Sequence, residues 1–243
     1  MLFLSEQIIV GLLIVFFSII SYYKKSLDLN GILLGLVVGV ITYLLGGIIS
    51  FYLMILFYVS AESLTRIARK IKRKGKHEIR TTGNILGNSG AALIVLALGS
   101  TELMLNGFRF PGLMFQGFNV AFFGAMAAAL SDTLSGEIGM LSKKKPFLIT
   151  TLKEVETGTD GGISFLGLFA GIIFSALIGL IFHYLTGSFA GLIAVTAAGF
   201  IGTLTDSLLG ATFERKKVLN NTSVNFLASL TGAVIAVLLF SFL

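Results

Sequence analysis

The sequence predicts an all-α fold, a polytopic membrane helix bundle of about eight transmembrane helices, with seven also compatible with the pattern. Hydrophobic residues make up 55% of the 243 residues and charged residues only 12%, and the mean hydropathy is +0.94. Soluble domains carry about 25% charged residues. The 29 glycines and 2 prolines are typical of closely packed transmembrane helices. The lack of cysteine excludes disulfides and thiolate metal sites.

Apolar runs of about 17 to 25 residues, the length that crosses a bilayer, define the expected helices. They lie at 5–22, 30–46, 48–66, 82–100, 115–134, 162–184, 188–209 and 221–242. The first run lacks a basic n-region and an A-x-A cleavage site, so we expect a retained helix and not a signal peptide. Little more than the stretch GGIIS separates the second run from the third, which leaves a count of seven open. A single span over both runs would be too long for a bilayer of about 30 Å.

The basic residues predict the orientation. With eight helices, every Lys and Arg except Arg109 falls in a loop on the same side of the membrane. Such asymmetry makes that side cytoplasmic and places both termini outside, and it favours a short turn at 46–48. The same distribution explains the net charge of +6 without nucleic-acid binding. We therefore expect one integral membrane domain over 1–243, with a cytoplasmic loop at 135–161 that carries part of a site.

An acidic residue followed by Ser or Thr and by Leu occurs three times, at 62, 132 and 206. The spacings of 70 and 74 residues suggest a helical hairpin used three times in the same orientation. Chance recurrence of a short tripeptide is the alternative. Glu62 also has Arg66 close to it in sequence, so an ordinary ion pair explains this residue as well as a functional polar site does.

Asp132 and Asp206 each end an apolar run, which predicts a polar pocket around them. A carboxylate at bilayer depth costs about 2.5 to 3.5 kcal/mol, so it normally faces the protein interior and has a partner. A carboxylate that caps a loop or pairs with a nearby Lys is the alternative. Thr133 and Ser135 add hydroxyls beside Asp132. Hard oxygen ligands of this kind suit Mg²⁺ shared with phosphates, and they are also compatible with Na⁺ or H⁺ coupling.

Glu137 is the third candidate ligand. It lies five residues after Asp132, about 140° around a regular helix. It therefore joins Asp132 only if the helix breaks near Gly136. With that break, we expect Asp132, Glu137 and Asp206 to hold one or two Mg²⁺ ions.

The stretch TGTDGGIS, residues 157–164, leads into an expected helix at its cytoplasmic end and predicts a phosphate-binding loop. Two adjacent glycines and three hydroxyls at a helix N-terminus offer backbone N–H groups and the positive end of the helix dipole. The pattern GxxxxGK is absent, so this is not a P-loop, and a plain flexible turn is the alternative. The candidates here are Gly158, Thr159, Asp160, Gly161, Gly162 and Ser164, with Lys143, Lys144, Lys145 and Lys153 as nearby cations.

The stretch NILGNSG, residues 84–90, places Asn84 and Asn88 four residues apart on one helix face. Hydrogen bonding between helices explains these residues as well as ligand binding does. Arg80 precedes this helix and Arg215 follows the second aspartate motif, and both are candidates to hold phosphates. We expect most of the basic run at 66–76 to contact lipid headgroups.

Three blocks, AALSDTLSGEIG, TGTDGGISFLGLFAG and GTLTDSLLGAT, resemble the signature blocks of the membrane family of domain of unknown function 92. That family includes the transmembrane protein 19 group and the plant phytyl-phosphate kinases. The resemblance covers essentially the whole chain and is strongest from 121 to 215. The asparagine block RTTGNILGNSG departs from the more Gln- and Asn-rich pattern of the family. The motif positions that carry over are Asp132, Thr133, Ser135, Glu137, Gly158, Thr159, Gly161, Gly162, Ser164, Asp206, Ser207 and Gly210.

The resemblance implies an isoprenoid monophosphate kinase that uses a nucleoside triphosphate, CTP in the plant case, to make the diphosphate. The expected partners are the nucleotide, the isoprenoid monophosphate and membrane lipids, with Mg²⁺ as cofactor. Because the acceptor is already an anionic phosphate, no strong general base is required. An ion-coupled transporter is the competing class, since intramembrane acids, broken helices and repeats occur there too. A lipid cytidylyltransferase or alcohol kinase would use much the same architecture.

Overall fold

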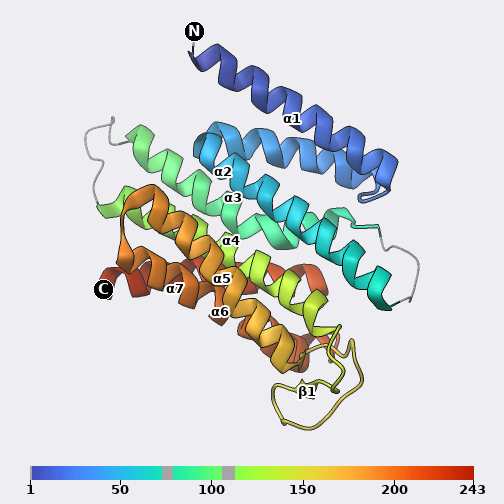
Figure 1. Ribbon diagram of the computed structural model, residues 1–243. Helices are drawn as coiled ribbons and strands as arrows, with labels where there is room; N and C mark the ends of the chain where they lie inside the picture. Colours follow the sequence, from blue (N-terminus) through green and yellow to red (C-terminus); the bar gives the residue numbers. More distant parts are fainter. Residues whose placement is uncertain (1, 73–78, 106–112) are drawn as a thin grey trace.

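The structure is a computed structural model that describes residues 2–72, 79–105 and 113–243, and it is a helical bundle (Figure 1). Arg109 and the basic residues at 73–78 lie outside the described residues. Seven helices of the described chain are long and apolar enough to cross a membrane. They are α1 (Leu2–Lys24), α2 (Leu29–Lys72), α3 (Thr82–Leu105), α4 (Leu113–Gly139), α5 (Phe165–Thr186), α6 (Phe189–Leu209) and α7 (Asn221–Phe242). The predicted integral membrane bundle is confirmed.

The longest helix, α2, is a hairpin of two membrane-spanning arms. Gly47 interrupts it with φ 71° and ψ −170°, a left-handed backbone that glycine adopts readily. A Cβ on Gly39 would lie 3.6 Å from a ring carbon of Phe51, whereas one continuous helix would hold these positions about 18 Å apart. The arms 29–46 and 48–72 are therefore antiparallel, as Figure 1 shows. With the arms of α2 counted separately, the described helices offer eight membrane-length segments, and the turn lies where the charges predicted it.

The turns of the bundle gather at two ends. The turn within α2 and the turn between α5 and α6 lie at the left in Figure 1, on the same side as both termini. The opposite end holds the α1–α2 turn, the segment after α4 and the segment before α7. All the described Lys and Arg residues belong to that opposite end. The described part of the chain therefore has the one-sided distribution of basic residues that the sequence predicts.

The segment between α4 and α5 is more ordered than the sequence predicts. Strands β1 (Phe147–Leu148) and β2 (Gly162–Ile163) pair antiparallel, and the Ser164 hydroxyl caps α5 by accepting a hydrogen bond from the Gly167 N–H at 3.1 Å. The predicted loop 135–161 begins too early, because α4 continues to Gly139.

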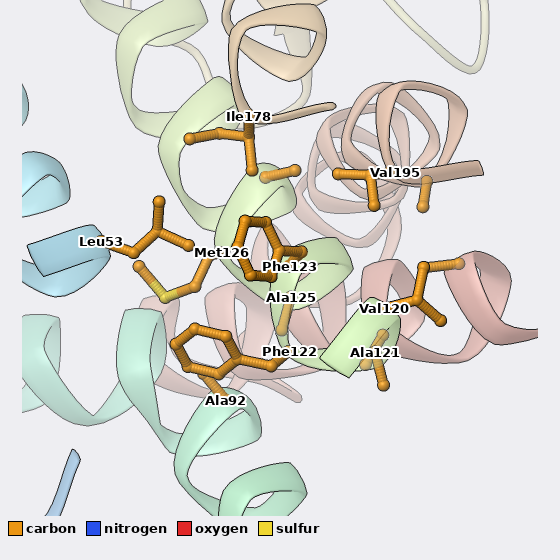
Figure 2. Close-up of a cluster of buried hydrophobic side chains, with 14 of the residues drawn as sticks. Leu53, Ala92, Val120, Ala121, Phe122, Phe123, Ala125, Met126, Ile178 and Val195 are labelled. Atoms are coloured by element: carbon orange, nitrogen blue, oxygen red, sulfur yellow. The ribbon is translucent and has the colours of Figure 1, made fainter. Parts of the chain in front are cut away.

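The core is built around α4, which packs against α3, α5, α6 and α7. Phe122, Phe123 and Met126 of α4 are almost completely buried and meet side chains from the neighbouring helices (Figure 2). Small residues allow backbone contact beside them. A Cβ on Gly124 would clash with the Ala236 side chain and lie 2.5 Å from the Gly232 carbonyl oxygen. Glycine is therefore required where α4 crosses α7.

We predict that Gly124→Ala destabilises the bundle, because the added methyl has no space between α4 and α7. Overpacking of this kind costs about 1 to 3 kcal/mol. The matched control is Gly117→Ala on the same helix, where a Cβ would have nothing within 4 Å. Thermal unfolding in detergent should show a lower Tm for Gly124→Ala only, and equal Tm values for the two variants would contradict this packing.

Candidate active site

A polar cavity of about 680 Å³ opens at the end of the bundle that carries the basic residues. It lies between the ends of α4 and α6, the starts of α3 and α7, and the segment that precedes α5. The predicted site residues that line it are Asp132, Thr133, Ser135, Glu137, Gly158, Thr159, Asp160, Gly161, Gly162, Ser164, Asp206, Ser207, Arg80, Asn84 and Asn88. Segments more than 100 residues apart in the chain thus meet in one cavity.

The two aspartates lie close together because α4 and α6 run in the same direction and touch through hydroxyls. The Ser131 and Thr203 hydroxyl oxygens are 2.7 Å apart, and Ser131 also donates to the Gly199 carbonyl at 3.0 Å. Asp132 follows Ser131 directly, and Asp206 lies one turn beyond Thr203. The carboxylates are close enough to repel each other in a desolvated setting. A cation between them would remove that repulsion.

Further negative charge surrounds Asp206. Asp160 from the glycine-rich segment and Glu214 from η1 (Gly210–Glu214), a short π-helical extension of α6, both act on it by charge repulsion. Glu214 was not predicted from the sequence. With Asp132, three acidic residues thus lie around Asp206, so this part of the cavity favours a positively charged ligand.

Glu137 lines the same cavity as Asp132, although α4 stays helical to Gly139 and the break near Gly136 is absent. The cavity wraps around the end of α4, so residues on two sides of the helix line it. The Thr65 hydroxyl donates to Glu137 Oε1 at 2.6 Å and accepts from Arg80 Nη2 at 3.2 Å. Thr65 therefore connects the carboxylate of Glu137 to the guanidinium of Arg80.

The carboxylates partly fit a metal ion. Glu137 Oε2 and Asp206 Oδ1 are buried side-chain oxygens that have no hydrogen-bond partner in the described part of the protein. Within those residues, however, no group of three His, Cys, Asp or Glu side chains is arranged to hold a metal. The three predicted ligands are therefore not a preformed cage. Mg²⁺ keeps several waters and is usually bound by one or two carboxylates together with substrate phosphates, which suits the pair Asp132 and Asp206.

The glycine-rich segment 157–164 is a shaped turn that packs against the end of α6. Gly158 and Gly161 have φ values of 91° and 74°, and the Gly162 N–H donates to the Thr159 carbonyl at 2.9 Å. A Cβ on Gly161 would lie 2.5 Å from the Ala211 nitrogen. Gly210, one of the motif positions carried over from the family, is involved in this packing and does not line the cavity.

Apart from Arg80, the basic residues predicted to bind phosphate do not line the cavity either. They are Lys143, Lys144, Lys145, Lys153 and Arg215, and all are exposed. Lys145 Nζ donates to Glu156 Oε1 at 2.9 Å, which raises the pKa of Lys145 and lowers that of Glu156. The four lysines are exposed around β1, so closeness in sequence to the glycine-rich segment does not bring them into the cavity, and their phosphate-binding role stays a prediction.

Two asparagine pairs flank the cavity. Asn84 and Asn88 on α3 were predicted, whereas Asn221 and Asn225 on α7 were missed although they have the same four-residue spacing. The helices touch at Gly87, where a Cβ would lie 2.9 Å from a backbone oxygen of α7. Asn88 Nδ2 donates to the Asn84 carbonyl and Asn84 Oδ1 accepts from the Thr81 N–H, so part of their bonding stabilises α3 itself.

Glu62, the acid of the third tripeptide, does not line the cavity. Ser26 donates to its Oε1 at 2.9 Å and Arg66 pairs with the same oxygen. Arg66 also donates to the Lys24 carbonyl at 2.7 Å. Glu62 thus fastens α2 to the α1–α2 turn, as the ion-pair alternative predicted.

The sequence profile of the family described as integral membrane protein DUF92 matches residues 12–233. The chain belongs to the DUF92 family. Among DUF92-like relatives, the uncharacterized membrane protein MJ0933 of Methanocaldococcus jannaschii is 38% identical, over 89% of this chain and 88% of its own. Protein PGR of Arabidopsis thaliana is 32% identical over 80% of this chain and 74% of its own, and the chloroplastic protein VTE6 of the same plant is 29% identical over 90% and 66%. No solved structure matches the chain.

Asp132→Asn tests whether the aspartate pair binds a cation. In EDTA the variant should be at least as stable as the unaltered protein, because one of two repelling charges is gone. Saturating Mg²⁺ should raise the Tm of the unaltered protein by roughly 5 to 10 °C and that of the variant by much less. The control is Glu156→Gln, an exposed carboxylate outside the cavity. An equal Mg²⁺ response in all three proteins would show that the pair does not bind the ion.

Proposed function

We propose that this protein is an isoprenoid monophosphate kinase. It transfers the terminal phosphoryl group of a nucleoside triphosphate, with CTP favoured, to an isoprenoid monophosphate. The bond between the terminal phosphorus and its bridging oxygen breaks, and a bond forms from that phosphorus to a phosphate oxygen of the lipid. The products are the lipid diphosphate and a nucleoside diphosphate.

The observation that carries the proposal is the chemistry and place of the polar cavity. A lipid phosphate keeps its hydrocarbon chain in the bilayer and its headgroup at the interface, so its kinase needs a polar site at the ends of transmembrane helices. The cavity lies at such ends, and it combines carboxylates with a glycine-rich turn and with the side chain of Arg80. The plant phytyl-phosphate kinases of the family that the sequence resembles support the same reaction class.

Each side chain of the cavity has a proposed task. Asp132 and Asp206 would hold Mg²⁺, with Glu137 in the same cavity as a further ligand, and the ion when bound would supply positive charge to the donor phosphates. Arg80 and the amide groups of the asparagine pairs bind the phosphate oxygens by hydrogen bonds. Phosphoryl transfer depends on such positioning and electrostatic stabilisation.

The acceptor phosphate is already anionic at neutral pH, so the reaction does not need a catalytic base. This agrees with the cavity lining, which contains no His in the described part of the chain. We place the cavity at the cytoplasmic face, because the described basic residues gather at this end and nucleotides are available there.

Asp206→Asn should abolish Mg²⁺-dependent kinase activity. Transfer of label from terminally labelled CTP or ATP to farnesyl, geranylgeranyl and phytyl monophosphate measures it, with Mg²⁺ or EDTA. Loss of the charge that holds the metal should lower the rate by roughly a thousandfold. Glu156→Gln, which alters a carboxylate outside the cavity, should keep full activity. No transfer to any acceptor, together with Na⁺- or H⁺-dependent uptake in proteoliposomes, would replace the kinase by an ion-coupled transporter.

Thr65→Val tests a positioning role. The valine removes the hydroxyl that donates to Glu137 and accepts from Arg80, while it keeps the shape of the side chain. Loss of an outer hydrogen bond to a metal-binding carboxylate typically costs 10- to 100-fold in metal affinity or activity, so the Mg²⁺ concentration for half-maximal rate should rise by about that factor. Thr65→Ser retains the hydroxyl and should restore the Mg²⁺ dependence. An unchanged Mg²⁺ dependence in Thr65→Val would exclude this role.

A further inference from the structure

A second cavity lies beside the first, and it is apolar. It is enclosed by α1, both arms of α2 and the start of α3. Ile14 and Phe17 line it from α1, and Gly35, Gly39 and Phe51 line it from α2. None of these helices forms the aspartate pair. Figure 1 shows α1 at the edge of the bundle beside α2, where bilayer lipid can reach it.

The lining residues show that this cavity is a groove parallel to the helices. They lie within 14–21 on α1, 32–39 on the first arm of α2 and 51–58 on the second arm. In each range they recur at three- and four-residue spacing, so each helix presents one face to the groove. Seven residues of helix rise by about 10 Å, which is therefore the length of the groove. The end of the groove nearer the polar cavity lies at Ser21 and Tyr58. The opposite, deep end, nearer the turn at Gly47, lies at Gly39 and Phe51.

The groove and the polar cavity meet at Arg80 and Asn84, which line both. The Arg80 backbone is fixed to the α1–α2 turn, because its N–H donates to the Ser26 carbonyl at 3.0 Å and its carbonyl accepts from the Asp28 N–H at 3.2 Å. Its guanidinium donates to Thr65 in the polar cavity. A cationic side chain is thus held where an apolar groove opens into the cavity that contains the aspartates.

We propose that this groove binds the isoprenoid chain of the acceptor, with the lipid phosphate at Arg80, an inference that rests on the proposed kinase function. An amphiphile matches this junction, because its anionic head fits the cationic Arg80 and its hydrocarbon chain fits the apolar groove. The groove encloses about 150 Å³, and an apolar cavity of this size holds a benzene molecule. It therefore receives the part of the chain next to the phosphate, and the rest of a long chain passes between the helices into the bilayer.

Glycines in the groove allow a test by filling it. A Cβ on Gly39 would be in ordinary contact with Ile14 and Phe51 at 3.6 Å, so a larger side chain there occupies the deep end. A Cβ on Gly35 would have only Leu27 near it, at 4.0 Å, so a side chain there occupies the middle. Gly11 on α1 has nothing within 4 Å and does not line the groove, which makes it the matched control.

The first experiment measures KM and kcat of the purified protein in nanodiscs with geranylgeranyl and dimethylallyl monophosphate. Gly39→Leu should raise KM for the geranylgeranyl acceptor by roughly tenfold or more and leave the one-unit dimethylallyl acceptor unaffected. Gly35→Leu should raise KM for both acceptors. Gly11→Leu should match the unaltered protein. An active protein whose glycine variants all keep the original chain-length dependence would overturn the groove assignment.

A binding experiment separates failure of the groove from failure of the kinase. Geranylgeranyl monophosphate with a photoreactive diazirine near its head is crosslinked to the protein, and the labelled peptides are identified. The groove is supported if the probe labels 14–21, 32–39 or 51–58 and unlabelled geranylgeranyl monophosphate suppresses that labelling. This result counts even in a preparation without kinase activity. Labelling confined to α5 or α6 overturns it. Suppression by phosphatidylglycerol at the same concentration also overturns it, because the groove would then be a site for bulk lipid.

Discussion

The close approach of α4 to α6 and α7 is the contact on which the rest of the molecule depends. In a bilayer the hydrophobic effect does not drive helices together, so association depends on packing and on hydrogen bonds between helices. Gly202 and Gly232 leave no room for a Cβ beside Ala128, and the Ser131 and Thr203 hydroxyls bond just beyond. This contact brings Asp132 and Asp206 together. The same small residues that stabilise the bundle therefore create the electrostatic repulsion at its end.

The walls of the polar cavity are formed partly by backbone and partly by side chains that also connect separate helices. Gly161 touches Ala211 across the turn, so the segment 157–164 closes one side of the cavity by packing. Thr65 and Arg80 close another side and connect α2 and the start of α3 to Glu137. Three separate parts of the chain must fold before the carboxylates acquire their surroundings. A polar site at a membrane interface thus depends on correct packing of apolar helices well away from it.

The fold was largely predictable from the sequence, because hydrophobic length and the distribution of Lys and Arg respond to the bilayer alone. The turn at Gly47 is an example, since two spans could not fit in one. The cavity lining was predictable where a local pattern marks it, as at the aspartates that end apolar runs and at the glycine-rich segment 157–164. Thr65 and Asn225 gave no such signal, because their role depends on which helices meet. The exposed lysines do not line the cavity, because closeness in sequence says little about direction after a short strand such as β1.

Gly47 has a consequence for how the chain is inserted. A straight α2 of 44 residues would measure about 66 Å, roughly twice the hydrocarbon thickness, so the fold needs a reversal there. That reversal determines the direction in which every later helix crosses the membrane. If the reversal failed, α3 to α7 would enter the membrane upside down, and the cavity with its aspartates would face the opposite compartment. One left-handed glycine thus helps to determine which compartment supplies the ligands of this protein.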